Sequence, residues 1–128
     1  MNVNALRKDH WTPLHLASHC GKLDMVQLLL DHGASVNAED NLLRTPLHHV
    51  TAGEYAVEED GVRVSRLLIE RGADVNAQDL HCETPLHLAS STGRIGVVLA
   101  LLARAAVQTD GGQSPSQLGS EGEFYPKK

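Results

Sequence analysis

Aromatic residues and cysteines are scarce in this chain. Aromatic side chains make up 3% of its 128 residues, so the core must be built mainly from aliphatic side chains. The two cysteines, Cys20 and Cys82, are too few for a disulfide framework. Their number fits free thiols in a reducing compartment, and we therefore expect an intracellular protein.

Basic charge and long apolar runs are also missing. The chain has 11 Lys and Arg residues against 16 Asp and Glu residues, and its formal net charge is −5. The longest apolar run, residues 95–107, contains Arg104 and is shorter than the roughly 20 residues of a membrane-spanning helix. The first residues lack the pattern of a secretory signal. We expect a protein that binds neither nucleic acid nor a membrane.

Repetition is the feature that the chain has in abundance. The string Thr-Pro-Leu-His occurs three times, beginning at Thr12, Thr45 and Thr84. A second string, Gly-Ala-x-Val-Asn-Ala, lies between them at residues 33–38 and 72–77. The first two starts are 33 residues apart and the next two are 39 apart, so the middle unit carries about six additional residues. This periodicity predicts a repeat protein.

Each unit is predicted to contain two short helices. Thr12 is a good N-cap, and the proline that follows it suits the first helical position. The apolar side chains predicted to lie on one face of this helix are Leu14, Leu16 and Ala17. A second helix is predicted over residues 23–32, ended by Gly33 in a left-handed conformation. Helices this short are marginal alone, so the pairs must stack on one another.

The two strings resemble those of the ankyrin repeat family over residues 3–107. The resemblance implies an all-α solenoid of stacked antiparallel helix pairs with projecting β-turn or hairpin loops. The units are residues 1–11, the tail of a truncated preceding repeat; 12–44, a repeat; 45–83, a repeat with the insertion near 54–59; 84–112, a repeat with a shortened turn; and 113–128, a degenerate half repeat with a flexible tail. In the last unit Ser114 and Pro115 keep the cap and the proline.

The resemblance also implies a function, namely a non-catalytic, monomeric protein–protein interaction module without a cofactor. Such proteins bind partners through the turn tips and the solvent-facing side of the first helices. The corresponding residues here are Lys8, Asp9, Trp11, Asn41, Leu42, Arg44, Leu80, His81 and Glu83 at the tips, and His19, Cys20, Ser91 and Thr92 on the helices. An exposed apolar stripe is expected from Trp11, Leu42, Leu43 and Leu80. The alternative is a structural or regulatory segment of a longer ankyrin-repeat protein, with no partner of its own.

Eight histidines and two cysteines invite a metal hypothesis. The resemblance implies instead that His15, His48 and His87 link neighbouring turns through hydrogen bonds to the threonine hydroxyl and the backbone. The pairs at residues 19–20 and 81–82 lie in different units, whereas zinc needs four ligands around one point. Because no catalytic constellation or phosphate-binding loop is visible either, we expect neither a metal site nor an enzyme.

Three features allow more than one interpretation. His49 stands where the other units have leucine, at an expected core position, so it is either a tolerated buried histidine or a pH-sensitive element. The acidic insertion around Tyr55 is either a mobile solvated loop or a contact loop for a basic partner. Asn37 and Asn76 are expected to bond the backbone and fix the turns, with hydroxylation as the alternative that the resemblance adds.

Overall fold

The computed structural model describes residues 4, 10–53, 55 and 57–103. In this part of the chain every regular element is a helix. The helices are α1 (Pro13–His19), α2 (Leu23–Asp31), α3 (Pro46–Thr51), α4 (Glu58–Glu70), α5 (Pro85–Thr92) and a sixth helix over residues 95–103. None of these helices has the length and apolar character needed to cross a membrane.

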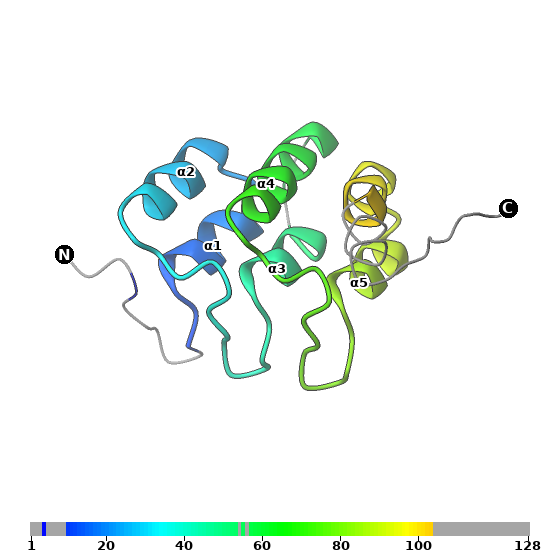
Figure 1. Cartoon of the computed structure of the whole chain (residues 1–128). Helices are drawn as coiled ribbons and strands as arrows, with labels where there is room; N and C mark the ends of the chain where they lie inside the picture. Colours follow the sequence, from blue (N-terminus) through cyan, green and yellow to red (C-terminus); the bar gives the residue numbers. More distant parts are fainter. Residues whose placement is uncertain (1–3, 5–9, 54, 56, 104–128) are drawn as a thin grey trace, which may run out of the picture.

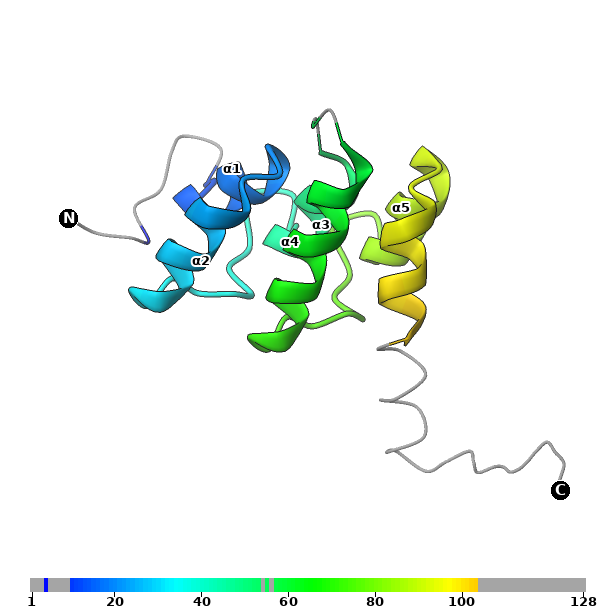
Figure 2. The ribbon, with the colours of Figure 1, turned by 90° about the horizontal axis from the view of Figure 1, so that it is seen from above.

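The helices form two layers with loops projecting from one side. Figure 1 shows α1, α3 and α5 in one layer and α2, α4 and the 95–103 helix in the other, with the hairpin loops extending away from both. Viewed from above, the second-layer helices lie side by side, and each covers the first helix of its own pair (Figure 2). The predicted all-α solenoid of stacked helix pairs is therefore confirmed.

The first helix of every pair begins in the same way. The hydroxyl oxygens of Thr12, Thr45 and Thr84 accept from the backbone N–H three residues later. The histidine at that later position returns a bond, since its Nδ1 accepts from the threonine N–H at 2.9, 3.1 and 3.0 Å in the three repeats. Two orphan donors are satisfied at each helix start, which explains why Thr-Pro-Leu-His predicts it so well.

The core lies between the two layers and is aliphatic, as expected. Leu14, Leu47, Leu68 and Leu101 are fully buried and come from all three repeats. Gly33 and Gly72 end the second helices with φ of 94° and 99°, the left-handed conformation that the sequence predicts. The pairs therefore share one continuous apolar core.

The prediction for Leu16 is wrong. Its side chain is 42% exposed, whereas His49, at the equivalent position of the second repeat, is 4% exposed. His49 packs on rings of the first repeat, so this position faces the preceding repeat. In the first repeat the same position faces away from the second repeat, and Leu16 stays exposed.

The insertion is held at Tyr55, which does not fit a mobile solvated loop there. The Tyr55 hydroxyl donates to the carbonyl of Val50 at 3.0 Å. Its ring occupies space left by glycines, because a Cβ on Gly53 would lie 2.9 Å from the ring and one on Gly61 would overlap the hydroxyl. The guanidinium of Arg94, from the third repeat, lies 4.2 Å from the ring centroid.

Two acidic side chains of this region are paired within the chain. Glu58 lies 3.4 Å from Arg94 and accepts from the N–H of Gly96 at 3.2 Å, while Glu59 lies 3.2 Å from Arg63. Because these charges already have partners, the hypothesis of a contact loop for a basic partner loses much of its electrostatic basis. Residues 54 and 56, the predicted 1–11 tail except residues 4, 10 and 11, and the predicted 113–128 unit lie outside the described residues.

Candidate interaction surface

Each of two turn tips is folded around an aspartate. One oxygen of Asp40, Oδ1, accepts from the N–H groups of Leu42 and Arg44, both at 2.9 Å. The equivalent oxygen of Asp79 accepts from the N–H groups of residues 81 and 83, also at 2.9 Å. A carboxylate that accepts two backbone bonds fixes the path of a short loop, so the tips are preorganised.

These two tips, and the equivalent loop before α1, each carry a non-glycine residue in the left-handed region. His10, Leu43 and Cys82 occupy equivalent positions and have φ of 66°, 59° and 62°. Leu43 was noted above as an exposed tip residue, and its turn is formed despite the absence of glycine. An L residue in this conformation stores about 1–2 kcal/mol of strain.

Replacing Leu43 with Gly should therefore raise the free energy of unfolding by about 1 kcal/mol, because glycine adopts this φ without steric cost. Urea denaturation measures the change. Leu42→Gly is the matched control, since Leu42 is not among the residues with positive φ, and it should give no increase. A loss of stability in Leu43→Gly would contradict the prediction.

Neighbouring tips are joined to one another. The N–H of Leu80 donates to the carbonyl of Leu42 at 2.8 Å, and Nε of Arg44 lies 3.2 Å from Asp79 Oδ2. Asn37 reaches the next repeat as well, because its amide donates to the carbonyl of Gly72 and its Oδ1 accepts from the N–H of residue 74 at 2.8 Å. The expected bonding of Asn37 to the backbone is confirmed, and it acts between repeats.

The predicted role of the repeated histidines is also confirmed for the first two repeats. His15 Nε2 donates to the carbonyl of Arg44, and His48 Nε2 donates to the carbonyl of Glu83, both at 2.9 Å. The acceptor is in each case the residue directly before the next threonine. These bonds, together with those between the tips, set the register of one repeat on the next.

The structure places the predicted site residues in different environments. Leu42 and Leu80 are 38% and 57% exposed at adjacent tips, and Leu43 is exposed beside them. Trp11 does not extend this stripe, because its ring packs on His49 with the centroids 4.2 Å apart. The other exposed predicted residues are Asn41, His81, Ser91 and Thr92, and the half-buried ones are His19, Cys20, Arg44 and Glu83. Lys8 and Asp9 lie outside the described residues.

Several of these residues form contacts within the protein that the sequence analysis did not predict. The Thr92 hydroxyl lies 2.9 Å from the carbonyl of Leu88 and 3.1 Å from that of Thr51, so it links α5 to α3. Arg44 is engaged with Asp79, and the His19 ring lies 5.4 Å from that of Trp11. Of the predicted surface, the tips and Ser91 on α5 are therefore exposed without such a contact.

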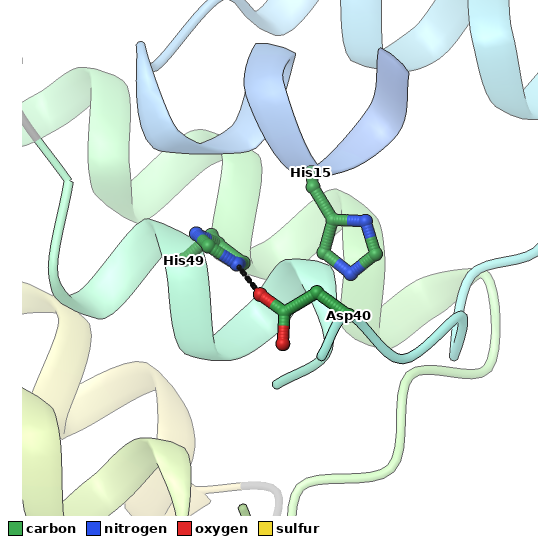
Figure 3. A group of neighbouring side chains, drawn as sticks. All are labelled: His15, Asp40 and His49. Atoms are coloured by element: carbon green, nitrogen blue, oxygen red, sulfur yellow. Dashed lines mark hydrogen bonds and ion pairs between the residues drawn. The ribbon is translucent and has the colours of Figure 1, made fainter. Parts of the chain in front are cut away.

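Beneath the first of these tips lies a buried polar group of three side chains, His15, Asp40 and His49 (Figure 3). Nε2 of His49 is 2.8 Å from Asp40 Oδ2. Burial of the ring lowers the pKa of His49 to about 4, and the bond to Asp40 opposes this shift only in part. His49 is thus neutral at neutral pH and donates its Nε2–H to the carboxylate.

Asp40 remains ionised in this buried setting. Burial by itself raises its pKa, but the hydrogen bonds from His49 and from two backbone N–H groups outweigh burial, and the pKa falls below the ordinary value of 3.8. Sequence reasoning missed Asp40. The residue could have been found from the repeat alignment, because Asp40 and Asp79 occupy the same position in successive repeats.

The same three residues offer ligand atoms within 4.8 Å of one another, which is the geometry of a possible cation site. The chemistry of the donors does not fit a cation. Nδ1 of His15 accepts from the N–H of Thr12 and its Nε2 donates to the carbonyl of Arg44, so neither nitrogen has a lone pair to offer. The bond between His49 and Asp40, and the bonds that Asp40 and His15 each form to the backbone of Arg44, instead hold the tip in place.

Comparison with known proteins gives a consistent result. The family model described as "Ankyrin repeats (3 copies)" matches residues 1–79, and one described as "Ankyrin repeats (many copies)" matches residues 68–118. Rabankyrin-5 of Mus musculus is 46% identical over 50 residues, 39% of this chain and 4% of the relative. The serine/threonine-protein kinase VIK of Arabidopsis thaliana is 51% identical over 45 residues, 35% of this chain and 10% of the relative.

A putative ankyrin repeat protein of Rickettsia bellii is 43% identical over 44 residues, 34% of this chain and 18% of the relative. The chain thus spans only a small part of the length of these curated relatives. Ankyrin repeats are a generic protein–protein interaction module and typically have no catalytic role; enzymes among the relatives, such as the kinase, owe their activity to other domains. Repeated caps, stacked helix pairs, linked tips and matched sequences all agree, and the chain belongs to the ankyrin repeat family.

Proposed function

We propose that this chain is a non-catalytic docking module whose turn tips and first-helix faces bind a protein partner. One observation carries the proposal. Leu42 and Leu80 present exposed apolar side chains at adjacent tips, and the backbones of these residues are joined by a 2.8 Å hydrogen bond. Exposed apolar side chains on a fixed backbone suit binding, because little conformational entropy is lost when a partner docks.

The surroundings of the two leucines support this function. Asn41 and His81 are exposed next to them, and they provide the polar rim that protein interfaces have around an apolar centre. The ring nitrogens of His15 and His48 are engaged in hydrogen bonds within the repeats, which supports a role without catalysis. Both cysteines are free thiols, which supports our proposal of an intracellular location.

The double variant Leu42→Ala/Leu80→Ala should weaken partner binding by at least about tenfold, or 1.4 kcal/mol, because it removes the apolar centre of the surface. The partner is identified by affinity capture with the unaltered chain, and its Kd is then measured by calorimetry. Leu28→Ala is the matched control, since Leu28 is an exposed leucine of α2 in the other layer. Unchanged binding in the double variant, with thermal stability also unchanged, would reject the tips as the binding surface.

A second candidate function is that of a packing segment within a longer ankyrin array. The observation that favours it is the small fraction, 4% to 18%, of the curated relatives that the chain matches. In that case the isolated chain captures no discrete partner, and fusion to neighbouring repeats raises its stability, since interface energies add along a solenoid. The capture experiment separates the two functions.

A further inference from the structure

The two tips that are folded around Asp40 and Asp79 are held in different ways. In both, Oδ1 of the aspartate accepts from two backbone N–H groups of its own loop. The second carboxylate oxygen has a different partner in each tip. Oδ2 of Asp40 lies 2.8 Å from the ring of His49, whereas Oδ2 of Asp79 lies 3.2 Å from the guanidinium of Arg44. One tip therefore depends on a histidine, and the other on an arginine that stays charged in acid.

The ring of His49 is what distinguishes the two tips. Leu88 stands at the equivalent position of the third repeat and has no polar group to offer. Each tip receives one further bond, from the ring of His15 or His48 to a backbone carbonyl, and its length is 2.9 Å in both cases. An effect of acid on these two bonds is common to both tips, so a difference between the tips reports on His49.

The surroundings of His49 disfavour a positive charge. Its side chain is 4% exposed, and its ring centroid lies 4.2 Å from that of Trp11, 5.0 Å from His15 and 5.9 Å from His19. The titratable groups that act on the ring are these two histidines of α1 and Asp40 (Figure 3). The buried residues of α4 and α5, which also pack on α3, carry no ionisable side chain. A protonated ring is therefore better accommodated when the site opens to water.

We propose that the tip at Asp40 is an acid-sensitive half of the docking surface: when His49 takes up a proton, this tip detaches from α3, while the tip at Asp79 keeps its own bonds. The low pKa of His49 in the folded chain, about 4 against an ordinary 6.5, supports this direction. Detachment frees Leu42, whose N–H is bound to Asp40. The consequence for a partner, namely the loss of the Leu42 contact, rests on the proposed function.

The test measures amide hydrogen exchange in the full chain by ¹⁵N NMR at pH 7 and pH 5. The reporters are the amides held by the two aspartates, Leu42 and Arg44 in one tip and His81 and Glu83 in the other. The protection factor, which is the ratio of the intrinsic to the observed exchange rate, should fall by at least about tenfold more in the first pair, because opening restores the ordinary proton affinity of His49. Both aspartates stay ionised over this range, since their pKa values lie below 3.8.

Two variants assign the effect to one ring. His49→Gln keeps a donor for Asp40 but does not titrate, so the difference between the tips should disappear. His81→Gln, at an exposed histidine of the other tip, is the matched control and should behave as the unaltered chain.

Three results would overturn the proposal. Equal losses of protection at the two tips of the unaltered chain would mean that acid only unfolds the solenoid as a whole. The absence of any loss, or an undiminished difference between the tips in His49→Gln, would also contradict it. The measurement needs no partner, so it is independent of the binding experiment with Leu42→Ala/Leu80→Ala, and failure of one does not imply failure of the other.

Discussion

Between pH 7 and pH 4 the free energy of unfolding should fall by about 3 kcal/mol through His49 alone. The pKa of this ring is lowered to about 4 in the folded chain, from an ordinary value of 6.5. Below pH 6.5 the unfolded chain therefore binds a proton that the folded chain refuses. Stability is fully present above pH 6.5 and is lost progressively as the pH falls towards 4.

Two other buried groups, His48 and Asp40, also make the free energy of unfolding depend on pH. Burial also lowers the pKa of His48, which adds to the loss in the same window. The pKa of Asp40 lies below 3.8, so the stability that its ionised form contributes is lost only at still lower pH. The window between pH 6.5 and 4 thus reports on the buried histidines.

His49→Gln isolates the contribution of His49. A glutamine side chain can donate to Asp40 but does not titrate, so the variant should lose about 3 kcal/mol less than the unaltered chain over this window. Urea denaturation at a series of pH values gives the comparison. His81→Gln, at an exposed histidine, is the control and should follow the unaltered chain. Parallel curves for His49→Gln and the unaltered chain would disprove the role of His49.

Replacing Leu68 with Ala should lower the free energy of unfolding by about 2–5 kcal/mol. Leu68 is fully buried in α4, in the middle repeat, and contacts with both neighbouring pairs depend on that repeat. The loss combines the transfer energy of the removed methyl groups with the cavity left behind. Because a chain of three repeats has little stability to spare, this variant is expected to be close to unfolding at room temperature.

The same substitution at Leu28 is the control for Leu68. Leu28 lies in α2 at the position equivalent to Leu67 and is exposed, so Leu28→Ala should cost less than about 1 kcal/mol. Calorimetry or urea denaturation of both variants measures the difference. Equal losses at the two sites would mean that the core does not lie between the layers as described.

The sequence predicts the helix starts and the stacking well because their causes are local. A threonine, a proline and a histidine three residues after the threonine satisfy one another within a single turn, whatever surrounds them. Gly33 and Gly72 likewise adopt the φ that their own chemistry permits. Where neighbours along the chain determine the conformation of a residue, the sequence pattern alone was enough to predict that conformation.

The remaining features depend on neighbours that are distant in sequence. Leu16 and His49 occupy the same position of the repeat, and their burial differs because, within the described residues, a preceding repeat covers His49 alone. The bond of Asp40 to His49 and the contact of Tyr55 with Arg94 join residues whose proximity follows from stacking. Sequence spacing does not predict such pairs, so the sequence analysis predicted neither the packing of Trp11 on His49 nor the ordered position of Tyr55.

The contact of Arg94 with the middle repeat has a mechanical consequence. Arg94 touches the Tyr55 ring, Glu58 and the carbonyl of Gly53, and Glu58 binds the N–H of Gly96. These contacts join the N-terminal ends of α4 and the 95–103 helix, whereas α2 and α4 are joined near their C-terminal ends by the exposed ion pair of Asp31 and Arg71 at 2.7 Å. Under tension applied to the ends in mild acid, protonation of His49 should weaken the contact between the first and second repeats, whereas the contacts of Arg94 do not depend on a histidine.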